Sequence, residues 1–340
     1  MACVNFTGIP EASFYWKNIE TFPLISIIIA VVLTVIIFVL WIIHIHTITK
    51  YVSVVERREC LYWLAGIFPL ASLCCVVSAA VPRAINVMNA FILLYFARVM
   101  FTFWQYVRHL FGSTAEMSRI LQDSNIRIKF RSPPCGCCWP CLRPQDATKK
   151  NLGIVHKLVV QVAIVRPLML FISGIDKSNF PGAGVTTRLE TAVNIINLAS
   201  TLFSMYGLVM LTGLTVEPLK QYRPKASFHV LQAVLVSYSL QGAIFNILGD
   251  NGVIAGSSTL DSSTMAEIWN RLLLILEIFI LSILGTWMLG PSKNGVFDLH
   301  PEQRKQKTLA DDDQQAKARE FQLQQEQTAN LPQEPGVVAV

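Results

Sequence analysis

The chain is poor in charged residues. Asp, Glu, Lys and Arg together make up 15% of its 340 residues, whereas apolar types make up 53%. A soluble globular domain carries about 25% charged residues, so the composition argues against that class. The many aliphatic residues also argue against a disordered or fibrous chain. The composition therefore indicates a protein that crosses a membrane several times.

Signatures of soluble chemistry are missing as well. The sequence has no H-E-x-x-H, no G-x-S-x-G, no Walker A motif and no dinucleotide-binding glycine fingerprint. We therefore expect no enzyme, no ATP-driven pump and no bound cofactor. No internal repeat is visible, so an inverted-repeat transporter is not indicated. The basic residues lie where membrane topology puts them, so nucleic acid is not expected as a partner.

Seven apolar stretches are long enough to span a bilayer, which takes about 20 residues per helix. Their continuous apolar runs lack the alternation of a barrel strand, so helices are predicted. The sequence predicts an all-α membrane protein, a bundle of seven transmembrane helices within residues 24–289. The predicted spans are residues 24–48, 64–81, 87–109, 154–174, 190–214, 228–248 and 268–289.

The distribution of Lys and Arg predicts the orientation of the bundle. With the N-terminus outside, most Lys and Arg residues beyond the spans lie on the cytoplasmic side, as the positive-inside rule requires. Residues 1–23 are then extracellular, 112–153 form a cytoplasmic loop, and 290–340 form a cytoplasmic tail. That tail is rich in Gln, Asp, Glu and Ala, so we expect it to be mostly disordered.

Two features of the N-terminal residues fit this orientation. Asn5 begins an N-x-T sequence, which is a glycosylation site only on the outer side. Residues 1–22 lack the apolar core of a secretory signal peptide, so we expect the first span to insert as its own signal.

A cysteine cluster lies in the predicted cytoplasmic loop, between Pro133 and Pro144. The motif is C-x-C-C-x-x-C, formed by Cys135, Cys137, Cys138 and Cys141. A disulfide framework is disfavoured in the reducing cytoplasm. Acylation by palmitate is the favoured interpretation, because basic residues flank the motif and the membrane is near. A zinc site, or no special role, remains open, and for zinc the four thiols are unusually close in sequence.

Three ionisable side chains lie near the middle of predicted spans: Arg98, Arg166 and Glu277. Each such residue costs about 2.5–3.5 kcal/mol on insertion scales, so each calls for an explanation. Together they leave one positive charge, which would suit an amphipathic anion as substrate. The alternative is an ion network that only holds helices together.

Other polar residues fit the interior of the bundle. Asn194, Gln241 and Asn246 are secondary candidates for substrate binding. One face of the fifth span carries four polar residues at helical spacing: Asn194, Asn197, Thr201 and Ser204. Such a face more often joins helices than binds a substrate.

Short motifs occur in a fixed order between residues 61 and 289. They are Pro82-Arg83, Phe111-Gly112, the Pro-Cys run with Lys149-Lys150, Gln161 ahead of Arg166, Ser200-Thr201-Leu202, Leu240-Gln241, Asn251-Gly252 and Leu274-Ile275-Leu276-Glu277. This ordered set resembles the organic solute transporter subunit alpha family, which is related to the transmembrane 184 proteins. G-protein-coupled receptors also have seven spans, but their Asn-Pro-x-x-Tyr motif is absent from the last span.

The resemblance implies a function as well as a fold. Members of the family are alpha subunits that work with a single-span beta subunit in the plasma membrane, which is basolateral in polarised epithelia. They carry bile acids, conjugated steroids and similar amphipathic organic anions by facilitated, bidirectional diffusion. The alternative is a receptor-like or structural membrane protein of the transmembrane 184 type, without transport of its own. Membrane lipids are expected partners in either case.

Overall fold

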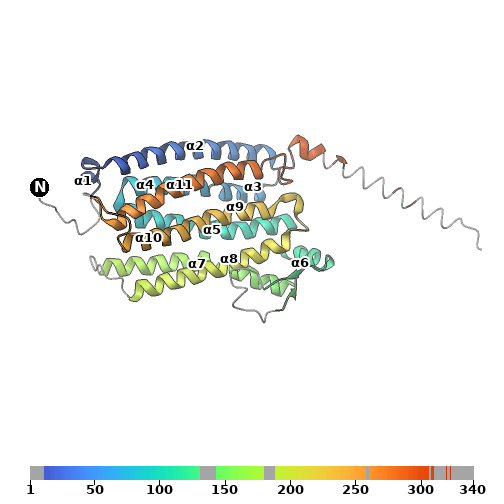
Figure 1. Ribbon diagram of the computed structural model, residues 1–340. Helices are drawn as coiled ribbons and strands as arrows, with labels where there is room; N and C mark the ends of the chain where they lie inside the picture. The colour runs from blue at the N-terminus through green and yellow to red at the C-terminus, as the bar shows by residue number, and fades with distance from the viewer. Residues whose placement is uncertain are drawn as a thin grey trace, which may run out of the picture.

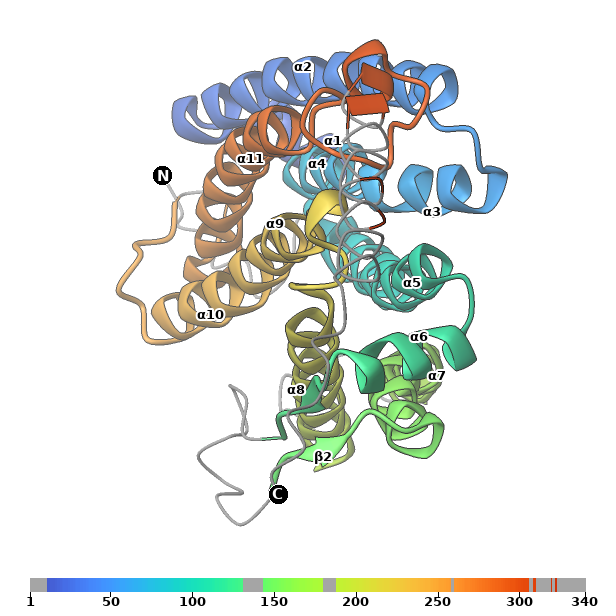
Figure 2. The same cartoon turned by 90° about the vertical axis from the view of Figure 1, so that its right-hand side faces the viewer.

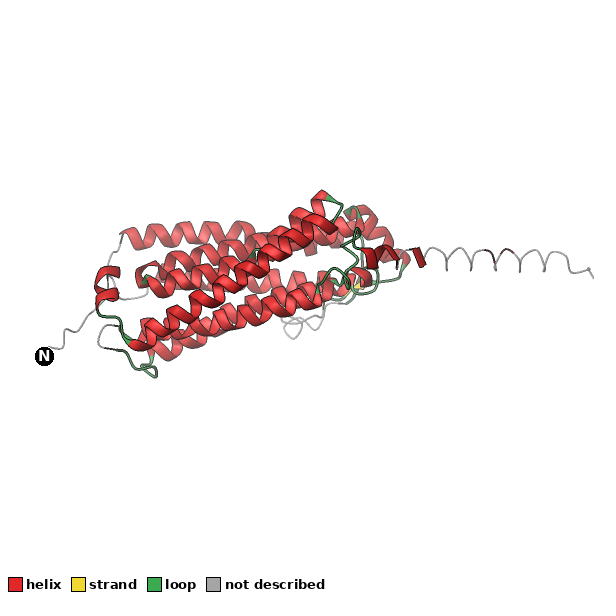
Figure 3. Ribbon diagram, turned by 90° about the horizontal axis from the view of Figure 1, so that it is seen from above, coloured by secondary structure: helices red, strands yellow, loops and turns green. Residues whose placement is uncertain are grey.

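The computed structural model describes residues 11–130, 143–179, 188–257 and 260–305, and four positions further along the tail. These residues form an elongated bundle of long, roughly parallel and antiparallel helices (Figures 1 and 3). Within them, seven helical segments are long and apolar enough to cross a membrane. The predicted helical fold with seven spans is therefore confirmed, whereas the side of the membrane on which each terminus lies stays a prediction.

The seven segments follow one another along the chain, and the longest connection, residues 112–148, lies between the third and the fourth. They are α2 (Thr21–Tyr51), α3 with α4 (Val55–Ala65, Ile67–Ala80), η1 with α5 (Pro82–Ala84, Ile85–Phe111), α7 (Lys149–Asn179), α8 (Arg188–Thr215), α9 with η4 and α10 (Pro224–Val236, Ser237–Gln241, Gly242–Asp250) and α11 (Ser262–Met288). A short helix, α1 (Ala12–Lys17), precedes the first span. The connections contain α6 (Thr114–Asp123), η3 (Lys220–Tyr222) and the antiparallel pair β1 (Arg127–Ile128) and β2 (Gln145–Asp146).

The second span begins nine residues before the predicted start at residue 64. The first turns of α3 are charged, Glu56-Arg57-Arg58-Glu59, so hydropathy places them outside the membrane. The helical path nevertheless continues from α3 into α4. Gly66 donates to the Tyr62 carbonyl at 3.0 Å, and Leu70 donates to the Gly66 carbonyl at 3.3 Å.

The sixth span is not a uniform α-helix. A π-helical turn, η4, separates α9 from α10, and it was not predicted from the sequence. A π-turn inserts one extra residue into the helical ladder and is frequently found at functional sites. The position of η4 therefore indicates where a functional site could lie.

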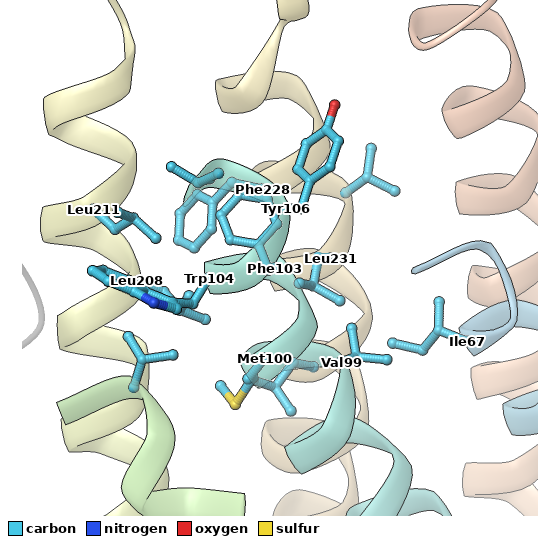
Figure 4. Packing of buried hydrophobic residues seen from close by; sticks show 14 of the residues in the cluster. Ile67, Val99, Met100, Phe103, Trp104, Tyr106, Leu208, Leu211, Phe228 and Leu231 are labelled. Atoms are coloured by element: carbon cyan, nitrogen blue, oxygen red, sulfur yellow. The ribbon is translucent and has the colours of Figure 1, made fainter. Parts of the chain in front are cut away.

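The interior of the bundle is built around α5. Met100 and Phe103 of α5 lie on the side of Leu208 of α8 and Phe228 of α9, whereas Val99 of α5 lies on the side of Ile67 of α4 (Figure 4). Viewed end-on, α5 and α9 lie between one group formed by α2, α4 and α11 and a second group formed by α7 and α8 (Figure 2). Because lipid is as apolar as these side chains, close packing rather than hydrophobic burial holds the spans together.

The chain after α11 turns back onto the bundle. Val296 and Phe297 are buried, and Asp298 accepts a hydrogen bond from the backbone of Ser53 at 3.0 Å. Leu299 donates to the Tyr51 carbonyl at 3.1 Å. Residues 290–305, which the sequence analysis assigned to the tail, thus close the end of the bundle where α2 ends.

Candidate substrate cavity

A cavity of about 640 Å³ lies among α5, α7, α8, α11 and the sixth span. We call it the polar cavity, because polar side chains from all of these segments line it. They are Asn89, Arg166, Asn197, Thr201, Gln232, Tyr238, Ser239, Asn246, Glu267, Asn270 and Arg271. Binding pockets for small molecules measure about 300–1,000 Å³, so its size suits a small organic ligand.

Two local features bring the polar groups into this cavity. The π-turn η4 carries Tyr238 and Ser239 into the lining. On α11, Glu267, Asn270 and Arg271 are spaced three and four residues apart, so they share one face of the helix.

The α7–α8 wall of the cavity carries an arginine that has no counter-ion among the described residues. Arg166 is 8% exposed and donates to the Thr201 hydroxyl, which in turn donates to the Asn197 carbonyl at 2.7 Å. No carboxylate of the described residues pairs with it. A buried cation without a partner is costly in a membrane, so this wall is suited to receive an anion.

The α11 wall carries a second arginine that is neutralised internally. Arg271 is paired with Glu267 at 2.7 Å and donates to the Asn89 side-chain oxygen, also at 2.7 Å. The Tyr238 hydroxyl donates to the same Asn89 oxygen at 2.9 Å. Arg271 is thereby held by α5, η4 and its own helix. Among the described lining residues, the two arginines and Glu267 leave one net positive charge.

The polar cavity opens sideways between α8 and the sixth span. Leu198, Leu202 and Val236 line it and are also exposed on the outside of the bundle, at 62%, 42% and 43%. This surface is apolar and lies within the spans, so it faces lipid in a membrane. An amphipathic molecule in the bilayer therefore has a direct route to the charged walls.

A second, smaller cavity lies at the other end of the bundle. It measures about 270 Å³ and is lined by the last turns of α2 and α11, by α3, α4 and α9, and by residues after α11. We call it the apolar pocket, because its lining is dominated by residues such as Leu64, Phe68 and Leu231. His44 is the ionisable side chain in its lining.

The structure separates the predicted site residues into two groups. Arg166 and Asn246 line the polar cavity, and Gln241 lies beside it and donates to the Asn270 carbonyl at 3.2 Å. Arg98 does not line it: its guanidinium lies over Trp63, 4.9 Å from the ring centre. Glu277 does not line it either, and one of its carboxylate oxygens is buried without a partner among the described residues.

Some predicted sites cannot be placed. The side chain of Asn194 lies outside the described residues, although its backbone is part of α8. The proposed glycosylation site Asn5 lies outside them as well. So do the four proposed acylation sites Cys135, Cys137, Cys138 and Cys141, together with their zinc alternative.

The α11 wall was not predicted from the sequence. Glu267 and Arg271 stand four residues apart at the edge of the predicted seventh span, where an ion pair usually belongs to the helix surface. Asn89 and Tyr238 carried no local signal, since their contact joins residues 149 positions apart. The i, i+4 spacing of opposite charges was the one clue available.

Fold and cavity together define a multi-pass helical membrane protein with a ligand-sized polar cavity among its spans. The chain belongs to the organic solute transporter Ostalpha family, whose profile matches residues 26–294. This is a family of solute transporters and not of enzymes. No solved structure matches the chain significantly.

Curated relatives carry the same family name. Organic solute transporter alpha-like protein 3 of Caenorhabditis elegans is 29% identical over 300 residues, which cover 88% of this chain and 86% of the relative. Organic solute transporter subunit alpha of Danio rerio is 24% identical over 67% of this chain and 70% of its own. The Homo sapiens protein of that name is 25% identical over 67% of each chain.

Proposed function

We propose that this chain is the alpha subunit of a facilitative, bidirectional transporter of amphipathic organic anions, such as bile acids and conjugated steroids. The observation that carries the proposal is Arg166, a buried arginine without a carboxylate partner among the described residues, in a cavity that opens toward lipid. A steroid conjugate has the matching form, with an apolar body and one anionic group. Arg166 binds that group, and Asn246 and Gln241 contact the remainder.

The name of the vertebrate relatives, subunit alpha, supports a second subunit. We propose a single-span beta subunit that docks against an outer helix of the bundle, in the plasma membrane and, in polarised epithelia, on the basolateral side. Acylation of Cys135, Cys137, Cys138 and Cys141 and glycosylation of Asn5 belong to the same proposal.

The test is uptake of a labelled steroid sulfate into cells that express the chain, the single-span partner, or both. We expect uptake only when both are present. Replacing Arg166 by Gln removes the charge that faces the anion. A hydrogen bond to a charged group is worth about 1.5–3 kcal/mol, so we expect the apparent affinity to fall about 10- to 100-fold.

Arg98→Gln is the matched control, because Arg98 is also an intramembrane arginine but lies on Trp63 outside the cavity. We expect it to change the affinity by less than about threefold. Equal losses of apparent affinity from both substitutions would contradict a role of Arg166 in binding the anion. No uptake in any combination, with the chain present at the cell surface, would favour a receptor-like or structural protein of the transmembrane 184 type.

A further inference from the structure

Two arginines line the polar cavity, and within the described part of the chain one of them has a carboxylate beside it. Arg166 on the α7–α8 wall has no such partner among the described residues, whereas Arg271 on the α11 wall is paired with Glu267. If only the number of positive charges mattered, Glu267 would be a disadvantage in an anion site. We propose that Glu267 makes the cavity selective for singly charged over doubly charged amphipathic anions. The inference rests on the proposed function and refines its substrate class.

The α11 wall is held in place by its buried ion pair. Arg271 is 3% exposed and Glu267 16%, and their charged atoms are 2.7 Å apart. The same nitrogen, Nη2 of Arg271, also donates to the side-chain oxygen of Asn89, and the ring of Tyr238 lies 6.0 Å from the guanidinium. The Nε atom of Arg271 is buried without a hydrogen-bond partner among the described residues. Since an ion pair is strong where water is scarce, an incoming anion cannot easily take Arg271 from Glu267.

Singly and doubly charged anions meet the α11 wall differently. A singly charged substrate places its anion at Arg166, and its uncharged end meets a wall whose two charges cancel. A doubly charged substrate brings its second charge toward Glu267, which is already engaged and is itself negative. The like-charge contact and the lost hydration of the second anion both act against binding.

Replacing Glu267 by Gln isolates this effect. Glu267→Gln keeps nearly the same shape and keeps a side-chain oxygen that accepts from Arg271. It raises the net charge of the lining from one to two positive charges. Arg271 also retains Asn89 as an acceptor, so the guanidinium stays in place and becomes available to a second anion.

The experiment measures binding of a steroid monosulfate and of the disulfate of the same steroid to the full-length chain in nanodiscs, by displacement of a labelled monosulfate. We expect the wild-type chain to prefer the monosulfate. In Glu267→Gln, we expect the ratio of the two affinities to move toward the disulfate by about tenfold or more, which corresponds to one strong electrostatic contact.

Three variants control this result. Glu277→Gln removes a carboxylate of the same helix that does not line the cavity, so the ratio should stay unchanged. Glu267→Asp keeps the negative charge and should keep the preference for the monosulfate. The double variant Glu267→Gln with Arg271→Gln returns the lining to one positive charge and should restore the wild-type preference.

The outcomes separate this inference from the proposed function. If the wild-type chain binds neither probe, the proposed function is refuted and the inference with it. If it binds both and folded Glu267→Gln leaves the ratio unchanged, only the role of Glu267 is refuted. Should Glu267→Gln fail to fold, Arg271→Gln serves instead. It leaves the lining without net charge and must weaken both probes, the disulfate more, for the inference to stand.

Discussion

The polar cavity and the apolar pocket occupy opposite ends of one helix bundle. Both contain hydroxyl groups, but the two cavities differ in whether their polar side chains form hydrogen bonds within one helix or between helices. In the apolar pocket, Thr47 donates to the Ile43 carbonyl at 2.8 Å and Thr286 donates to the Ser282 carbonyl at 2.7 Å, each within its own helix. In the polar cavity, the Thr201 hydroxyl also donates within its own helix, to the Asn197 carbonyl, but Arg166, Tyr238 and Arg271 donate to acceptors on neighbouring helices.

This difference shows how a binding site can be distinguished from a cavity that helix packing alone leaves between spans. A hydroxyl that donates to a carbonyl of its own helix already has a hydrogen-bond partner, so it does not need one from a ligand. The polar cavity instead holds buried polar atoms without a partner among the described residues, including the side-chain oxygens of Asn197 and Asn270. Bonds between helices and unpartnered groups, rather than the number of polar residues, mark the place where a substrate belongs.

The largest expected effect comes from introducing a carboxylate into each of the two cavities. Ala65 lines the apolar pocket and Ala243 lines the polar cavity. Ala65→Asp places a carboxylate where the described lining offers neither Arg nor Lys, so we expect a loss of about 3 kcal/mol in stability. Ala243→Asp meets a lining with a net positive charge, so it should lower stability less and weaken steroid sulfate binding more.

The measurement is thermal unfolding of both variants in the same detergent, combined with steroid sulfate binding at a temperature where both are folded. Similar losses of stability in the two variants would contradict the electrostatic distinction between the cavities.

A second pair of variants tests how closely the helices pack beside each cavity. A Cβ on Gly249 of α10 would lie 2.9 Å from the Cβ of Ala266 and 3.0 Å from the Cα of Ser263, so the backbone must move. We expect Gly249→Ala to cost about 1–3 kcal/mol, as overpacking does, and to weaken binding because Asn246 and Glu267 are displaced.

Gly285→Ala is the partner of this test at the apolar pocket. Its Cβ would lie 3.7 Å from Val230 and 3.8 Å from Phe68, which is ordinary contact. Since alanine is the better helix former by about 0.5–1 kcal/mol, we expect unchanged or slightly higher thermal stability and unchanged binding. A larger loss from Gly285→Ala than from Gly249→Ala would show that the packing near the cavities has been misjudged.

Most of the fold follows from local patterns in the sequence. Seven long apolar runs give seven spans, because a bilayer imposes length and composition on each helix separately. The charged beginning of α3 and the π-turn η4 were not predicted. Both depend on contacts with neighbouring helices, which the composition of one segment does not encode.

The candidate site was only half predictable for the same reason. Arg98 and Arg166 are equivalent in the sequence, since each is an arginine in the middle of an apolar run. Packing separates them: one lies over Trp63, and the other lies against Thr201 in the cavity. The α11 wall depends on Asn89, which comes from a helix far away in the sequence.

The smallest expected effect concerns single hydroxyl groups in the two cavities. Tyr238→Phe keeps the ring beside Arg271 but removes the hydrogen bond from η4 to Asn89 on α5. Such a bond is worth about 0.5–1.5 kcal/mol, so thermal stability should fall by that amount. Thr286→Val removes a hydroxyl that bonds only within α11, and we expect a change below about 0.5 kcal/mol. If thermal unfolding ranked the two in the opposite order, bonds between helices would not be what stabilises the polar cavity.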